Sequence, residues 1–138
     1  MELTIIIFLL GGLFLGWSLG ANDAANVFGT AVGTRMVQFK TAAIVCSIFV
    51  ILGAIISGSG TTETLGKLGS INALPGAFAA CVAAGLSVYI MTKSGLPVST
   101  TQAIVGAIIG WNLYTGSSTN IQVLITILGT WVLCPIIA

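Results

Sequence analysis

The sequence predicts an all-α integral membrane protein. Of its 138 residues, 57% are hydrophobic and 5% are charged, whereas a soluble domain carries about 25% charged residues. The 18 glycines are typical of membrane helices that pack closely together. This composition excludes a soluble enzyme. A formal net charge of +1 also excludes a nucleic-acid-binding protein, because such a protein needs a basic surface.

Four apolar runs without charged residues predict membrane-spanning helices. A helix needs about 20 residues to cross a hydrocarbon core of about 30 Å, so the shorter runs must borrow flanking residues. The first run follows an acidic residue instead of a basic segment, which predicts a retained span and not a signal peptide. The last run ends in WVLCPIIA, from which we expect a larger membrane assembly. The runs cover residues 3–20, 41–57, 73–92 and 121–138.

Two further segments, 21–36 and 95–113, are apolar enough to lie at membrane depth, yet they carry clustered polar side chains. Unsatisfied polar groups are costly in hydrocarbon, so such segments occur as broken or re-entrant helices that are buried in protein or line a wet cavity. We therefore expect discontinuous or re-entrant half-helices at both places, within one transmembrane unit over residues 1–138. The sequence leaves open whether 95–113 crosses the membrane or re-enters it.

The basic residues predict how the chain is oriented. If the N-terminus lies outside, the first span brings Arg35 and Lys40 to the cytoplasm, and the third span brings Lys93 there. Cytoplasmic loops of membrane proteins carry an excess of basic residues. The sequence thus predicts a multi-pass protein of the cell membrane.

A polar stretch over 58–72 is expected to form the loop on the opposite side. It holds Glu63 and Lys67, and their i,i+4 spacing predicts a solvated ion pair. A role in gating is the alternative interpretation.

The first polar cluster is Asn22, Asp23 and Asn26. On a helix, Asn22 and Asn26 share one face, and Asp23 neighbours Asn26. A carboxylate and two amides offer hard oxygen ligands for Na⁺ or a site for a proton, and their N–H groups can donate to an oxyanion. The structural alternative is hydrogen bonding between helices. An acidic residue inside a membrane favours the functional interpretation.

The second polar cluster is Ser99, Thr100, Thr101 and Gln102, just after Pro97. Proline suits the first turn of a helix. Helix N-termini carry partial positive charge and bind phosphate or carboxylate groups. The hydroxyl oxygens could instead ligate a small cation, or the serine could act only as an N-cap.

The remaining chemistry in the sequence is sparse. The three cysteines have neither pairing nor metal-ligand spacing, and the sequence contains no histidine, the side chain that most readily carries protons near neutral pH. No nucleophile and base occur together, so we expect no enzyme activity and no cofactor.

Four stretches of the sequence resemble the inorganic phosphate transporter (PiT) family. They are GANDAANVFGTAVGTR at 20–35, TTETLGK at 61–67, GLPVSTTQAIVGAIIG at 95–110 and TWVLCP at 130–135. The family includes sodium- or proton-coupled phosphate carriers and some sulfate permeases. The resemblance implies one half of an inverted-repeat transporter, with substrate and cations bound near the midplane where two halves meet.

The resemblance has two departures. Gln102 stands where many members have a histidine, and this sequence contains one copy of each motif where the family pattern needs two. The sequence is therefore similar to an N-terminal half. We expect a second half-repeat, either in the same chain beyond Ala138 or in a second subunit.

Together, the residues and the resemblance predict symport of inorganic phosphate coupled to Na⁺. Proton-coupled phosphate transport or a sulfate permease is the alternative within the family. A structural or regulatory membrane subunit without transport of its own is the alternative of another class. The expected phosphate ligands are Asn22, Ser99, Thr100, Thr101 and Gln102, and the expected cation ligands are Asn22, Asp23, Asn26 and Thr100, with Na⁺ at Asp23 and Asn26.

Overall fold

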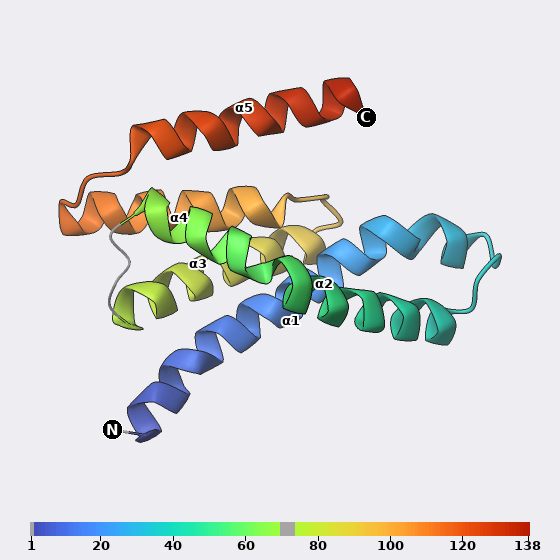
Figure 1. Ribbon diagram of the computed structural model, residues 1–138. Coiled ribbons are helices and arrows are strands. Elements are labelled where there is room, and N and C mark those ends of the chain that lie inside the picture. The colour runs from blue at the N-terminus through green and yellow to red at the C-terminus, as the bar shows by residue number, and fades with distance from the viewer. Residues whose placement is uncertain (1, 70–73) are drawn as a thin grey trace.

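A computed structural model describes residues 2–69 and 74–138, and all the regular structure in these ranges is helical (Figure 1). The prediction of an all-α protein is thereby confirmed. The helices, in chain order, are α1 (Glu2–Gly33), α2 (Phe39–Leu68), α3 (Leu74–Lys93), α4 (Thr100–Thr115) and α5 (Ile121–Ile137).

Within the described residues, three helices, α1, α2 and α3, are long and apolar enough to cross a membrane, and α5 is a shorter apolar helix. Large apolar side chains point outward along their length, among them Leu13, Ile55 and Ile136, which are all more than two thirds exposed. Water would disfavour so large an apolar surface, whereas lipid chains accept it. The chain is a multi-pass membrane protein.

Helix α1 is continuous where the sequence predicted a break. It runs without interruption through residues 21–33. The prediction of a separate discontinuous segment at 21–36 is therefore wrong. Asn22 and Asp23 find partners outside α1, and the helix backbone keeps its own hydrogen bonds. Helix α1 ends at Gly33, and residues 34–38 form the turn that leads to α2. In this turn Arg35 has a φ of 60°.

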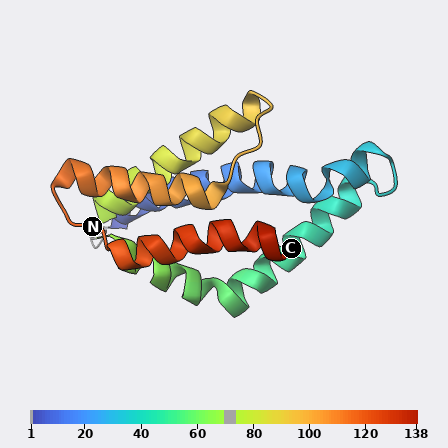
Figure 2. The ribbon, with the colours of Figure 1, turned by 90° about the horizontal axis from the view of Figure 1, so that it is seen from above.

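Helix α2 likewise extends beyond its predicted span, 41–57, and includes most of the predicted loop at 58–72. Residues 70–73 of that loop lie outside the described residues. Figure 2 shows α2 bending where its colour passes from teal to green. The bend fits the sequence Ser57-Gly58-Ser59-Gly60, followed by threonines that donate to the carbonyls of Gly58 and Gly60, a combination that bends helices.

Glu63 and Lys67 form the predicted i,i+4 ion pair, but they do so on the last turns of α2 and not in a loop. Both side chains are about two thirds exposed.

Helices α1 and α3 run parallel and pack most closely against each other. Small residues allow the contact: a Cβ atom added to Gly85 would lie 2.8 Å from the ring of Phe14. A second core joins α2, α4 and α5 through Leu68, Val105 and Ile127. Helix α4 lies antiparallel to α3, so a short link at 94–99 brings the end of α3 and the start of α4 together beside the middle of α1 (Figure 1).

Candidate functional site

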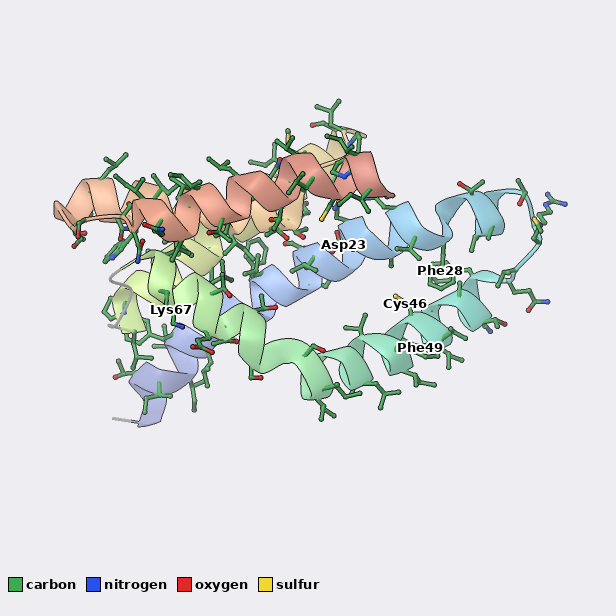
Figure 3. The ribbon with its side chains drawn as sticks, turned by 45° about the horizontal axis from the view of Figure 1, so that its top comes forward. Asp23, Phe28, Cys46, Phe49 and Lys67 are labelled. Atoms are coloured by element: carbon green, nitrogen blue, oxygen red, sulfur yellow. The ribbon has the colours of Figure 1, made fainter. Side chains whose placement is uncertain are left out.

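Polar side chains from three helices meet where the α3–α4 link reaches α1. We call this cluster the polar junction; it consists of Asn22, Asp23, Thr92, Thr100 and the backbone carbonyl of Val98. Figure 3 shows Asp23 on α1 where the helix passes the adjoining ends of α3 and α4. Helix α1 continues for ten residues past Asp23, which is about 15 Å at 1.5 Å per residue. The junction therefore lies well inside the length of α1.

Asn22 is the centre of the junction and is only 3% exposed. Its Nδ2 donates to Asp23 Oδ1 and to the Val98 carbonyl, both at 2.9 Å. Its Oδ1 accepts from Thr92 Oγ1 at 3.2 Å. Both amide protons are thus donated within the protein, as the burial of a polar group requires. The expectation that Asn22 donates to phosphate does not fit this arrangement, because no N–H remains for an oxyanion.

Asp23 and Thr100 connect α1 with the start of α4. Thr100 Oγ1 donates to Asp23 Oδ2 at 3.4 Å, and Thr100 is 8% exposed. Across residues 2–69 and 74–138, the ion pair of Glu63 with Lys67 is the single salt bridge, so the Asp23 carboxylate has no basic partner in this part of the chain. A half-buried, unpaired carboxylate at membrane depth favours a bound cation.

The start of α4 is capped as its sequence suggests. Ser99 is the N-cap residue, and its side chain accepts from the backbone N–H of Gln102 at 3.4 Å. The capping role considered for this serine is therefore confirmed. Capping uses one lone pair of the hydroxyl and leaves the first N–H groups of the helix pointing along its axis.

The structure does not bring all the expected ligands together. Asn26 is exposed, one turn beyond Asn22 on α1, and takes no part in the hydrogen bonds of the junction. Thr101 points away from Asp23 and lines a pocket of about 260 Å³ with Thr61 of α2 and Thr130 of α5.

Ser99 and Gln102 line a different hollow, an open groove of about 430 Å³ between α3 and α4. Most of its wall is apolar, including Met91 and Val98. Of the seven residues expected to bind ligands, the structure therefore gathers Asn22, Asp23 and Thr100 at one place.

Two members of the junction were not expected from the sequence. Thr92 lies at the end of an apolar run and looks like an ordinary residue of a span. The sequence signal that could have identified Thr92 is its position three residues before the Gly95-Leu96-Pro97 stretch, which ends the helix. Val98 contributes its backbone carbonyl, and side-chain chemistry gives no sign of such a role.

No group of three or more His, Cys, Asp or Glu residues that could hold a metal occurs among the described residues. The oxygen atoms of the junction, a carboxylate and hydroxyls, suit a hard monovalent cation better than a transition metal.

Fold and site together define a multi-pass helical membrane protein with a polar junction enclosed between its helices, an arrangement found in membrane transporters. The chain belongs to the phosphate transporter family, whose family model matches residues 19–138.

Similar proteins are found in archaea and bacteria. A protein of Pyrococcus furiosus is 36% identical over 96% of this chain, one of Methanocaldococcus jannaschii is 39% identical over 94%, and one of Haemophilus influenzae is 36% identical over 92%. Each carries the name "Putative phosphate permease". The chain spans 35%, 42% and 33% of the lengths of these three relatives. No solved structure matches the chain.

Proposed function

We propose that the chain takes part in Na⁺-coupled symport of inorganic phosphate, as one half of a transport unit. Membership of the phosphate transporter family supports the substrate. The contact that carries the proposal is Thr100 Oγ1 with Asp23 Oδ2, because it puts a carboxylate, which could bind a cation, next to the N-terminus of a helix.

The cation would bind at Asp23. Its carboxylate oxygens each accept one hydrogen bond and have lone pairs left for a ligand. Thr100 adds a hydroxyl oxygen, and Asn26 lies one turn further along α1. The absence of histidine from the sequence favours Na⁺ over a proton as the coupling ion.

Phosphate would bind at the N-terminus of α4, whose first turn holds Ser99, Thr100, Thr101 and Gln102 with their side chains on different faces. Such a terminus carries about half a positive charge and supplies free N–H donors for phosphate oxygens. The Ser99 hydroxyl accepts from the Gln102 N–H and keeps its own proton as a further donor.

Coupling follows from the closeness of these two places. Without a cation, the negative charge of Asp23 repels phosphate at Thr100. At a separation of about 5 Å and an effective dielectric constant of about 20, two unit charges repel by about 3 kcal/mol. Na⁺ on Asp23 removes this repulsion, so each ligand strengthens the binding of the other, as thermodynamic linkage requires.

The rest of the site would come from a second half-repeat of inverted orientation, in the same chain or in another subunit. The greater length of the relatives supports this part of the proposal. In such an arrangement, the polar junction lies near the interface of the two halves and close to the midplane.

Uptake of labelled phosphate into proteoliposomes tests the proposal, with the protein in its natural assembly. An inward Na⁺ gradient is expected to drive accumulation, and a pH gradient without Na⁺ is expected not to. Uptake driven by the pH gradient alone would instead assign proton coupling. Strong competition by excess sulfate would overturn selectivity for phosphate. Absence of uptake under all these gradients would favour the structural or regulatory subunit.

A further inference from the structure

We infer that Thr92 is a positioning residue of the cation site: its hydroxyl donates to the Asn22 amide oxygen and holds this amide in place, and the amide in turn holds the Asp23 carboxylate. The inference rests on the proposed function, because the effect is expected in the binding of the coupling ion.

Thr92 behaves differently from its neighbours. The hydroxyls of Ser87 and Ser94 donate to the carbonyls of Ala83 and Ile90 four residues earlier, both at 2.9 Å. This local bond is the usual one for a hydroxyl on a helix. The Thr92 hydroxyl instead crosses to α1 and donates to Asn22 Oδ1 at 3.2 Å.

This contact completes the hydrogen bonding of the Asn22 amide. The two ends of an amide have nearly the same shape and differ only as donor and acceptor. The Asp23 carboxylate and the Val98 carbonyl can only accept, so the NH₂ group faces them and the oxygen faces α3, where the Thr92 hydroxyl donates to it. Without this donor, the buried amide oxygen would lose its partner and the amide its tie to α3. An amide turned by half a rotation would set its oxygen against a carboxylate and a carbonyl, which repel it.

The oriented amide in turn places the carboxylate. Asn22 Nδ2 holds Asp23 Oδ1 at 2.9 Å, so Oδ2 is directed toward Thr100 at the start of α4. The same Nδ2 ties the α3–α4 link to α1 through Val98. Thr92 contacts no proposed ligand itself and acts through Asn22. Partners of this kind typically change metal-ion affinity by about 10–100-fold when they are removed.

The test is Thr92→Val, which keeps the shape of the side chain and removes the donor. The Na⁺ concentration that gives half-maximal phosphate uptake is expected to rise about tenfold, with the rate at saturating Na⁺ little changed. Thr92→Ser restores the hydroxyl and is expected to return the Na⁺ dependence to nearly that of the unaltered protein. Thr126→Val is the matched control, because the Thr126 hydroxyl bonds to Gln122 on its own helix, α5.

A Thr92→Val protein with unchanged Na⁺ dependence would overturn the inference, as would a Thr92→Ser protein that is impaired equally. In both cases the unaltered protein would still show Na⁺-driven uptake, so the proposed function would stand. Na⁺-dependent thermal stabilisation of the purified protein gives a second readout. If the unaltered protein shows neither Na⁺-driven uptake nor this stabilisation, the proposed function fails, and this inference fails with it.

Discussion

In the polar junction, Asp23 contributes a carboxylate and Thr100 contributes a hydroxyl that donates a hydrogen bond to it. The carboxylate lies half-buried on α1, and the hydroxyl lies at the first residue of α4. Asn22 occupies the space between α1 and the α3–α4 link and binds both. The Asp23 carboxylate therefore contacts the start of a helix that lies 77 residues away in the sequence.

The separate roles of these two residues can be distinguished by substitution. Asp23→Asn removes the charge and is expected to abolish the Na⁺ dependence of uptake and to lower its rate by about tenfold or more. Thr100→Val removes the hydroxyl that joins Asp23 to the start of α4, where phosphate would bind, and is expected chiefly to raise the phosphate concentration for half-maximal uptake. Labelled phosphate uptake at varied Na⁺ and phosphate concentrations measures both.

Glu63→Gln provides the matched control, because it removes a carboxylate that is exposed and lies outside the junction. Unchanged uptake in both Asp23→Asn and Thr100→Val proteins, at normal expression, would contradict the assigned roles and favour a subunit without transport of its own.

Sequence reasoning found Asn22, Asp23 and Thr100, because polar groups clustered in an apolar chain are conspicuous. It grouped Thr101 with Thr100, although they face different helices. Adjacent residues of a helix point about 100° apart, and the sequence does not say which face meets α1. Thr92 and the Val98 carbonyl were missed, because their role arises from the way two chain segments meet.

Among the helices, α1 and α2 are longer than the sequence suggested. Polar residues were expected to interrupt both, yet the backbone continues through Asn22 and Asp23 and through Glu63. A helix satisfies its backbone internally whatever its side chains are, so a polar side chain with a partner does not require a break. The apolar runs located the helices but not the residues at which they end.

Close packing of α1 against α3 depends on Gly85. A Cβ atom there would lie 2.8 Å from the Phe14 ring, and overpacking of this kind typically costs about 1–3 kcal/mol. Gly85→Ala is therefore expected to lower the melting temperature in detergent. Gly53→Ala on α2 is the matched control, because a Cβ atom there meets nothing within 4 Å; alanine should leave stability equal or raise it. Equal melting temperatures for the two variants would contradict the tight α1–α3 contact.

At the scale of the whole molecule, the orientation expected from the basic residues stays a prediction. The turn after α1 lies at one end of the molecule and Lys67 lies toward the other, whereas the link after α3 lies beside the middle of α1 (Figures 1 and 3). The bend of α2 and the depth of the α3–α4 link were not predictable, because both depend on contacts between distant segments.

This orientation can be tested by labelling with a membrane-impermeant maleimide. In a background without Cys46, Cys81 and Cys134, Lys67→Cys is expected to react in intact cells. Lys40→Cys, near the other end of α2, is expected to react only after permeabilisation. Equal labelling of both positions in intact cells would show that α2 does not cross the membrane in the predicted way.

The first turn of α4 holds two adjacent threonines with different surroundings. Thr100 touches α1, whereas Thr101 opens into the hollow shared with α2 and α5. Neighbours along the chain thus contact different helices, so altering one does not remove the tertiary contacts of the other. Asn22 and Thr92, 70 residues apart in sequence, share one bond and belong to a single thermodynamic unit.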